Sequence, residues 1–321
     1  MNLRFKIIFL SLLFFIILIG TGIFSLCLGT AFVPLQKLWN VELSHIIWQL
    51  RFPRILLAIL VGGALATSGT VMQVILKNPL ADPYILGISS ASSLGAVLAF
   101  VFHLPFGMIP ICAFMSAFIA IFIISRAAQK YASTSSHFLL LTGVLLSFLF
   151  SSIVTLVLSF AQPFEGATLL FWLMGGLSHP FSLFFILLSL SGTFLLFYLL
   201  YKKAYALNLL NLGEESAHAL GLSITSTQHY FFILSSLLTA LAVSLSGMIG
   251  FIGLMVPHFV RLLWGGDHRL TLPLNFLIGS WVLLLMDTLL RTCFIREFPI
   301  GVLTTLIGAP LFLIILWKKS T

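Results

Sequence analysis

Long apolar runs separated by short polar islands set the architecture of this chain. A membrane crossing takes about 20 apolar residues, so the runs predict about ten transmembrane helices. They lie near residues 6–28, 54–76, 84–103, 107–127, 137–160, 181–201, 229–247, 250–264, 272–291 and 300–317. The runs are continuous rather than alternating every second residue, which favours helices over a β-barrel. We therefore predict an all-α integral membrane protein with one transmembrane domain over residues 1–321.

Three stretches depart from the simple pattern. The run at 250–264 is short for a crossing, and the segment 163–180 is broken by glycines, which favours a short interfacial helix. The N-terminal run imitates a signal peptide, but it is longer than the roughly 7–15 apolar residues of such peptides and lacks a clean cleavage site. We expect it to be retained as the first span.

Composition agrees with the apolar pattern. Of the 321 residues 60% are hydrophobic and only 7% are charged, whereas a soluble domain carries about 25% charged residues. The formal net charge is +8, but the basic residues are single or paired and flank apolar runs, so nucleic-acid binding is excluded.

Cys27, Cys112 and Cys293 are isolated and have no metal-ligand spacing, which favours structural thiols and no metal site.

The basic residues also predict the orientation. With the N-terminus inside, eleven lie on the inner side: Arg4, Lys6, Lys77, Arg126, Lys130, Lys202, Lys203, Arg261, Arg269, Lys318 and Lys319. Five lie outside: Lys37, Arg51, Arg54, Arg291 and Arg296. This bias predicts that both termini are cytoplasmic. It also isolates a cluster of outer arginines, which from the residues alone are snorkelling anchors at the membrane interface.

Two polar islands interrupt the apolar runs. In the first, Lys77–Pro83, the residues Asn78, Pro79 and Asp82 are typical of a rigid turn between two helices. A structural role and a gating role are equally compatible with them. In such a chain, polar stretches lie at a membrane surface, line a cavity or meet a partner.

The second island, residues 207–221, predicts two short helices at the membrane surface. Gly213 interrupts the island, and Glu214 and Glu215 follow in the first turn of the second helix, where the helix dipole favours them. Gly221 suits the C′ position that ends this helix.

The same island offers a small apolar surface. Ala217 and Leu220 are three residues apart, so we expect them to share one face of the second helix. The pair of helices then forms a knob for a partner protein. An ordinary solvated loop is the alternative from the residues alone.

Motifs for chemistry within the chain are missing from the sequence. It contains no Gly-x-x-x-x-Gly-Lys-Ser/Thr phosphate loop, no Gly-x-Ser-x-Gly elbow and no zinc spacing. Asp287 is the clear intramembrane carboxylate, whereas an ion-coupled carrier usually needs several. We therefore expect a transport subunit rather than an enzyme, with no cofactor of its own and its energy supplied from outside.

Short segments along nearly the whole chain together carry a family resemblance. They lie at residues 51–54, 68–69, 77–83, 86–90, 141–144, 171–175, 212–221, 250–258, 267–269, 299–302 and 308–310. In this order they resemble the FecCD-type permeases of ABC importers, which carry iron–siderophore complexes, haem or vitamin B12. The resemblance implies a ten-helix fold like that of the vitamin B12 permease, forming a homodimer or pseudo-dimer around a pathway.

The resemblance also implies roles for particular residues. The coupling segment, about residues 206–222, would fit a cleft on a cytoplasmic ATPase that binds ATP and Mg²⁺, through Leu212, Gly213, Glu214, Glu215, Ala217, Leu220 and Gly221. The arginine cluster, Arg51, Arg54 and Arg291, would pair with glutamates of an extracytoplasmic binding protein. Asp287 precedes Arg291 by four residues, so the two could pair, either holding Arg291 for docking or neutralising it.

The expected function is therefore that of a permease subunit in the cytoplasmic (inner) membrane. Its partners would be the ATPase, the binding protein, a second permease copy (identical or paralogous) and membrane lipid, without nucleic acid. Ferric siderophore is the expected substrate, with haem and cobalamin as alternatives. The rival from another class is an ion-coupled secondary carrier.

Overall fold

The computed structural model describes residues 3–29, 46–130, 136–160, 163–178, 181–294 and 298–320. Within these residues every regular element is a helix, and 13 are α-helices. The α-helices are α1 (Leu3–Cys27), α3 (Phe52–Ile75), α4 (Ile88–Val101), α5 (Ile109–Lys130), α6 (Ser136–Phe160), α7 (Pro163–Leu173), α8 (Leu183–Lys202), α9 (Ala204–Asn211), α10 (Glu214–Ala219), α11 (Ile224–Ser246), α12 (Ile252–Trp264), α13 (His268–Cys293) and α14 (Ile300–Ser320). Three short helices of other types are η2 (Ile46–Arg51), η3 (Pro83–Leu86) and η4 (Phe106–Met108).

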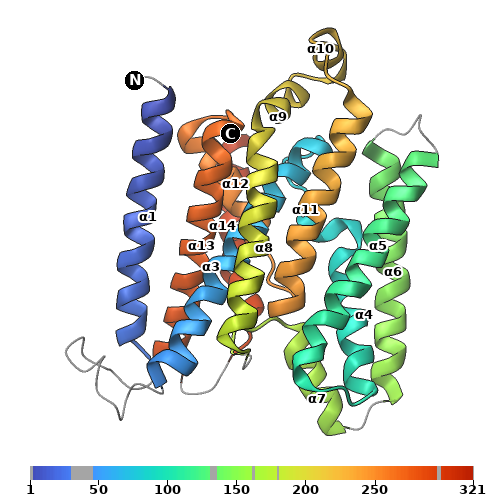
Figure 1. The fold of residues 1–321 in the computed structure, drawn as a ribbon, viewed down its shortest axis with the longest axis vertical. Coiled ribbons are helices and arrows are strands. Elements are labelled where there is room, and N and C mark those ends of the chain that lie inside the picture. Colours follow the sequence, from blue (N-terminus) through green and yellow to red (C-terminus); the bar gives the residue numbers. More distant parts are fainter. Residues whose placement is uncertain are drawn as a thin grey trace.

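These helices account for the predicted apolar runs. In the described part of the chain, 7 helices are long and apolar enough to cross a membrane, and three shorter apolar helices fall within α4, α12 and α14. The short run near 250–264 forms α12, which has 13 residues. The glycine-broken segment forms α7, which lies at one end of the bundle (Figure 1). The prediction of an all-α membrane protein is confirmed.

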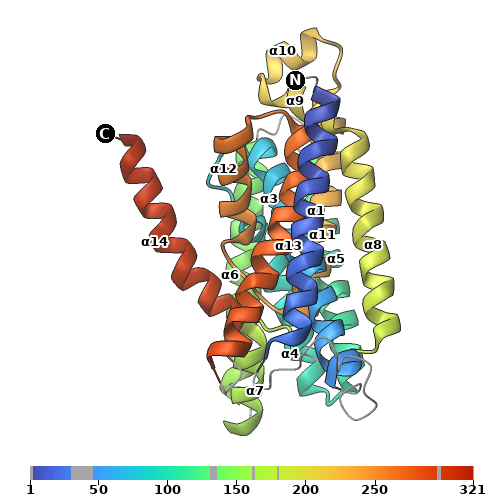
Figure 2. The ribbon, with the colours of Figure 1, turned by 90° about the vertical axis from the view of Figure 1, so that its left-hand side faces the viewer.

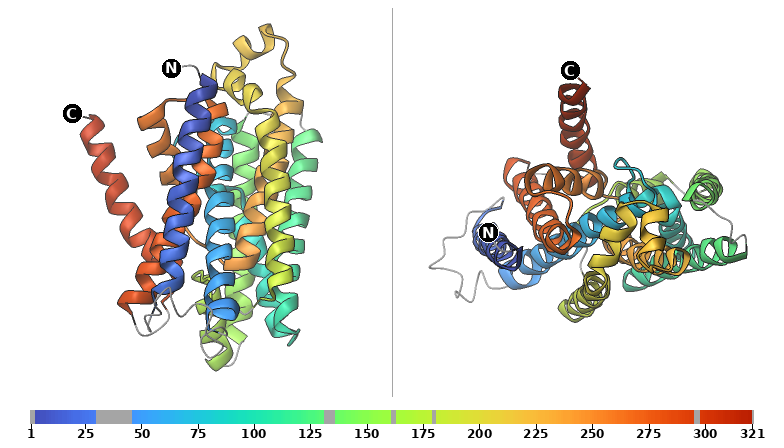
Figure 3. Two further views of the ribbon diagram at one scale, coloured as in Figure 1. Left: turned by 60° about the vertical axis from the view of Figure 1, so that its left-hand side comes forward. Right: turned by 90° about the horizontal axis from the view of Figure 1, so that it is seen from above.

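The bundle has two distinct ends. α9 and α10 lie at one end, together with the described beginning of α1 and the end of α14, whereas η2 and α7 lie at the other (Figure 1). We call these the α10 end and the η2 end. α14 leans away from the other helices (Figure 2), and the view from above shows it projecting on the side away from α8 (Figure 3).

α3 is the central helix of the bundle. The window that contains it is 89% buried within the chain, against 11% for α1 and 11% for α6. Its neighbour α13 runs antiparallel to it, and the backbones meet where Gly62 faces Gly279. A Cβ on either glycine would overlap the carbonyl oxygen of the other. Small residues of this kind let membrane helices approach closely.

Hydrogen bonds reinforce the α3–α13 pair on both sides of this crossing. Asn275 Nδ2 donates to Thr70 Oγ1 at 2.7 Å, and Ser280 Oγ donates to the Ile59 carbonyl at 2.7 Å. Lipid tails provide no hydrophobic force between helices, so close packing and interhelical hydrogen bonds must hold them together. α3 and α13 therefore behave as one packed unit.

The chain unwinds between α11 and α12, and Tyr84 of η3 supports this break. The Tyr84 hydroxyl donates to the Ile249 carbonyl at 2.9 Å and accepts from the Ile249 N–H at 3.0 Å. Ile249 is only 1% exposed, and unwound backbone at such depth needs internal partners. The first polar island is therefore tied through η3 to the start of α12.

The glycine crossing generates a stability prediction. We expect Gly62→Ala to force α3 and α13 apart and to cost about 1–3 kcal/mol, the usual range for overpacking. Thermal unfolding of the purified protein in detergent measures the loss. The matched control is Gly20→Ala on α1, where a Cβ meets nothing within 4 Å. Equal unfolding temperatures for the two variants would contradict the close crossing.

Candidate functional site

The predicted pair of short helices stands at the α10 end (Figure 1). Gly213 separates α9 from α10 with a φ of 102°, a conformation that glycine adopts without strain. Glu214 and Glu215 occupy the first turn of α10, as expected. There they lie at the positive end of the helix dipole. The two-helix form of this island is confirmed.

α10 ends in a Schellman motif. Gly221 has a φ of 82°, and its N–H bonds the His218 carbonyl at 2.9 Å. The N–H of Leu222 bonds the Ala217 carbonyl at 3.0 Å. Both bonds satisfy carbonyls that the end of the helix would otherwise leave without donors. The C′ position predicted for Gly221 is confirmed.

The prediction that Ala217 and Leu220 form a shared apolar face on α10 is wrong. Ala217 is 0% exposed, whereas Leu220 is 62% exposed, so the two do not share a surface. Leu220 is the C-cap residue, one position beyond the last helical residue. Leu212, before Gly213, is 64% exposed. The apolar side chains open to a partner are therefore Leu212 and Leu220, while Ala217 packs inward.

Asn208 attaches α9 to the beginning of α13. Its Nδ2 donates to Asp267 Oδ1 at 2.8 Å, and its Oδ1 accepts from the His268 N–H at 2.7 Å. The His268 ring Nδ1 lies 2.8 Å from the same oxygen. Asp267 also caps α13 by accepting from the Arg269 N–H. The hydrogen bonds from Arg269 and Asn208 hold the pKa of Asp267 low, at about 2.

Lys77 attaches the first polar island to α10. Its Nζ lies 2.7 Å from Glu214 Oε1, and both side chains are about half exposed. Hydrogen bonding to Lys77 lowers the pKa of Glu214. The two polar islands, far apart in sequence, therefore meet at the α10 end.

The first island forms the rigid turn that its residues predict. Asn78 Oδ1 accepts from the Leu80 N–H at 2.9 Å, and Asp82 Oδ1 accepts from the Tyr84 N–H at 2.9 Å, which caps η3. Pro79 sits exposed at the tip. Burial raises the pKa of Asp82 to about 6. The structural role of Asn78 and Asp82 is evident from these bonds, and a gating role stays a prediction.

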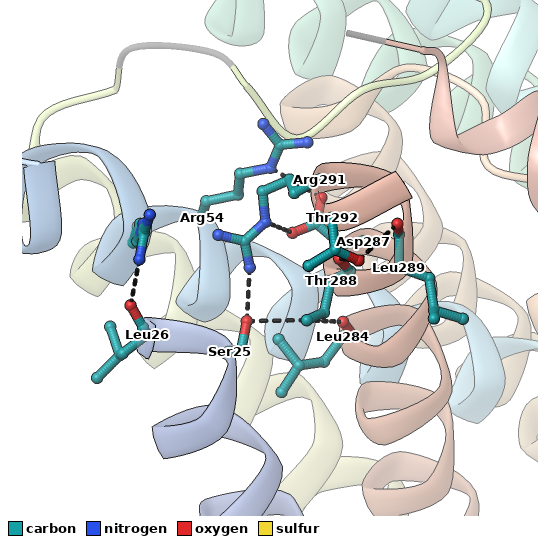
Figure 4. A network of polar contacts seen from close by, with 10 residues as sticks. Ser25, Leu26, Arg54, Leu284, Asp287, Thr288, Leu289, Arg291 and Thr292 are labelled. Atoms are coloured by element: carbon teal, nitrogen blue, oxygen red, sulfur yellow. Dashed lines mark hydrogen bonds and ion pairs between the residues drawn. The ribbon is translucent and has the colours of Figure 1, made fainter. Parts of the chain in front are cut away.

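The arginine cluster lies at the η2 end around Asp287 (Figure 4). Arg54 Nε donates to Asp287 Oδ1 at 2.8 Å, and Arg291 Nε lies 3.0 Å from Asp287 Oδ2. The Asp287 side chain is 0% exposed, and those of Arg54 and Arg291 are 14% and 11% exposed. Asp287 and Arg291 pair as expected, and Arg54 joins them from α3.

The cluster extends to the end of α1. Arg291 Nη2 donates to Ser25 Oγ at 2.5 Å, and Thr288 Oγ1 lies 2.8 Å from the same oxygen. Arg51 Nη1 donates to the Leu26 carbonyl at 2.6 Å, and carbonyls at a helix C-terminus favour a cation. Arg51 is 6% exposed, and its hydrogen bond links the end of η2 to the end of α1. Docking by these arginines stays a prediction.

Sequence reasoning missed several partners in these two sites. Asn208 and Ser25 were not singled out, and Lys77 was placed in the first polar island and on the cytoplasmic side without a partner being predicted for it. Asn208 carries a recognisable signal, since it is an amide among leucines in a polar island. Ser25 carries none, because a serine within a helix can equally bond a backbone carbonyl of its own helix. Across the described residues, no three His, Cys, Asp or Glu side chains are grouped to hold a metal.

Comparison with known proteins gives this arrangement a context. The sequence profile of the FecCD transport family matches residues 16–318. The vitamin B12 import system permease protein BtuC of Klebsiella pneumoniae is 36% identical over 308 residues, covering 95% of this chain and 92% of that protein. BtuC of Salmonella typhimurium is 35% identical over 309 residues, covering 95% and 93%.

Solved structures agree with the sequence relatives. An ABC transporter described as of metal-chelate type, in an inward-facing conformation, is 33% identical with a TM-score of 0.88, covering 96% of this chain and 98% of that one. PsaBC from Streptococcus pneumoniae in complex with Fab, at 18% identity and a TM-score of 0.58 over 87% and 92%, shares the fold alone. The chain belongs to the FecCD transport family. It is a multi-pass permease of the ABC importer class, a transport component rather than an enzyme.

The buried carboxylate generates a second prediction. We expect Asp287→Asn to destabilise the protein by about 3–5 kcal/mol, because it removes the buried carboxylate that two largely buried guanidinium groups share. Unfolding in detergent measures the loss. The control is Arg269→Gln, which breaks an exposed ion pair with Asp267 worth about 0–1 kcal/mol. Losses of similar size in both variants would show that Asp287 is dispensable.

The raised pKa of Asp82 generates a third. Burial raises the pKa of Asp82 to about 6 in the folded chain, whereas an aspartate in the unfolded chain has a pKa near 4. Ionisation of Asp82 therefore lowers the free energy of unfolding progressively as the pH rises from about 4 to about 6. We expect Asp82→Asn, which keeps an acceptor for the Tyr84 N–H, to unfold at the wild-type temperature at pH 4 and above it at pH 7. A difference in unfolding temperature between Asp82→Asn and the wild type that stays the same at both pH values would refute this prediction.

Proposed function

We propose that this chain is the permease subunit of a binding-protein-dependent ABC importer for a metal chelate. One observation carries the proposal. The exposed α9–α10 pair is bonded to elements that run through the bundle to the arginine cluster at the opposite end. A partner at the α10 end and a partner at the η2 end could therefore act on the same helices.

The α10 end is proposed as the cytoplasmic side. Described basic residues gather there, including Lys77, Arg126, Lys202, Arg261 and Arg269, as the positive-inside rule requires. The described beginning of α1 and end of α14 lie at the same end (Figure 1). Both termini would then be cytoplasmic, with the arginine cluster on the outer face.

A cytoplasmic ATPase is the proposed partner of the coupling segment. Leu212 and Leu220 offer exposed apolar contacts, and Glu215 offers an exposed charge beside them. The ATPase would bind ATP and Mg²⁺, and its closure would push α9 and α10. The transmembrane helices would then repack between two states that open to opposite sides. A second permease copy, identical or paralogous, would complete the pathway.

An acidic binding protein is the proposed partner of the arginine cluster. Arg51, Arg54 and Arg291 concentrate positive charge at the η2 end, with Asp287 as the carboxylate paired to two of them. Complementary charge at an interface raises the rate and the specificity of association. Their fixed positions would spare a docking protein the cost of ordering these long side chains.

The relatives support a substrate class for this proposal. The matched relatives are named for vitamin B12 import, and the matched structure is described as of metal-chelate type. Cobalamin is itself a cobalt chelate, so both descriptions favour a bulky chelated metal, with cobalamin the first candidate. Ferric siderophore, expected from the sequence, stays a prediction, and haem is the further alternative.

The rival hypothesis, an ion-coupled carrier, finds less support. Asp287 is the carboxylate within a described transmembrane helix, and it is bonded to both Arg54 and Arg291. A proton- or sodium-binding carboxylate must exchange its cation during the cycle, and these guanidinium groups compete for it. An importer driven by a separate ATPase needs no such group.

Uptake by cells tests the proposed function. A strain lacking this gene is given labelled cobalamin, ferric siderophore and haem, with and without the wild-type chain. We expect one uptake to depend on the chain and a P-loop ATPase to co-purify with it. Glu214→Arg with Glu215→Arg should abolish that uptake, since it reverses charge at the coupling segment and opposes Lys77.

Matched controls define the outcome of the uptake experiment. Thr225→Arg with Ser226→Arg adds charge at two exposed positions outside the coupling segment and should retain uptake. Membrane levels of all variants are compared by immunoblot. Normal uptake by the 214/215 variant would refute the coupling assignment, and a chain that transports without any ATPase would favour the carrier.

A further inference from the structure

The two ends of the permease are joined by the α3–α13 pair. α3 has 24 residues and α13 has 26, so each is about 36–39 Å long at 1.5 Å per residue. At the η2 end, Asp287 of α13 bonds Arg54 of α3 (Figure 4). The glycine crossing and two interhelical hydrogen bonds join the helices between their ends. Such a pair transmits displacement rather than absorbing it, because packed interiors deform little.

At the α10 end, each helix of this pair receives one of the coupling helices. Asn208 of α9 bonds Asp267 and His268 at the start of α13. Arg269 reinforces the same junction, since its guanidinium carbon lies 5.8 Å from the ring centre of Tyr205 on α9. On the other side, Glu214 of α10 pairs with Lys77, two residues beyond the end of α3. The attachment is therefore double: α9 is bonded to the start of α13, and α10 is bonded to a residue just beyond the end of α3.

The backbone at Lys77 sets this contact apart from an ordinary surface ion pair. Lys77 has a φ of 49° and is the C′ residue of a Schellman motif, in which its N–H bonds Val74 at 3.2 Å and that of Asn78 bonds Gln73 at 3.1 Å. Glycine is the usual residue there, and a side chain costs about 1–2 kcal/mol in this conformation. Lys77 keeps this strained backbone conformation, and its side chain reaches Glu214 from there.

We infer that the α3–α13 pair carries movement between the coupling segment and the arginine cluster. In this arrangement Asn208 and Lys77 are the positioning residues that fasten the coupling helices to the pair. The inference rests on the proposed function and adds the route of coupling to it. Because coupling between binding sites is reciprocal, docking at the arginines would equally bias the position of α9 and α10.

Two sets of variants separate this role from a purely structural one. Lys77→Gly relieves the backbone strain and removes the ion pair, so it should unfold at or above the wild-type temperature yet transport poorly. Asn208→Asp sets two carboxylates against each other at Asp267. Adding Asp267→Asn to this variant places the carboxylate at position 208 and the amide at position 267. One donor and one acceptor then face each other again, with their positions exchanged. Ser223→Asp is the control, adding an exposed carboxylate at the α10 end outside the coupling segment.

The readout is uptake of whichever labelled chelate the wild-type chain restores, divided by ATP hydrolysis of the purified complex in nanodiscs. We expect this ratio to fall at least about fivefold for Lys77→Gly and for Asn208→Asp, the lower range of allosteric coupling. The reversed pair should recover most of it, and Ser223→Asp should keep it. Hydrogen exchange should rise in α9 and the first turn of α13 for Asn208→Asp alone.

The outcomes discriminate between the two proposals. A wild-type ratio in Lys77→Gly or Asn208→Asp would overturn the inference, and so would a loss that the reversed pair fails to recover. In those cases the wild-type chain would still show uptake with its ATPase. If the wild-type chain restores no uptake and recovers no ATPase, the proposed function itself fails.

Discussion

The buried carboxylate of Asp287 is the interaction on which the η2 end of this permease depends. A charge in a membrane interior is expensive unless it is paired, and here one carboxylate stabilises two guanidinium groups from different helices. The consequence is a fixed relation between α3 and α13. Ser25 extends that relation to α1 through Arg291.

The fixed relation matters because α3 and α13 remain in contact along most of their length. Glycines and short polar side chains bring their backbones together, so a shift imposed at one end would reach the other. The coupling segment is bonded to both helices at the α10 end. A protein with 7% charged residues has thus placed several of them at the junctions between its helices.

The scarcity of charge also bears on which roles fall to the permease, the ATPase and the binding protein in an importer of this class. This chain would supply helices that change their packing, and a separate ATPase would supply the energy. Selectivity would reside largely in the binding protein, because an apolar pathway provides few hydrogen bonds to distinguish one chelate from another. The chain therefore contributes mechanical linkage rather than chemistry.

Some features followed from the residues alone because they depend on local constraints. Membrane thickness sets the length of an apolar run, and Gly213, the two glutamates and Gly221 mark a short helix by backbone and dipole preferences that act over one turn. Ala217 and Leu220 show the limit of this reasoning. Their spacing predicted a shared exposed face, but packing against the rest of the bundle buries Ala217 and leaves Leu220 exposed.

The sequence by itself determined that the chain is all-helical, where the two short helices α9 and α10 lie, and the pairing of Asp287 with Arg291, which are one helical turn apart. Only the tertiary structure decided that Arg54 shares that carboxylate, that Lys77 meets Glu214 and that Asn208 bonds the start of α13. These partners lie 233, 137 and 59 or more residues apart. Helical periodicity carries no information over such separations, because the packing of whole helices decides which side chains meet.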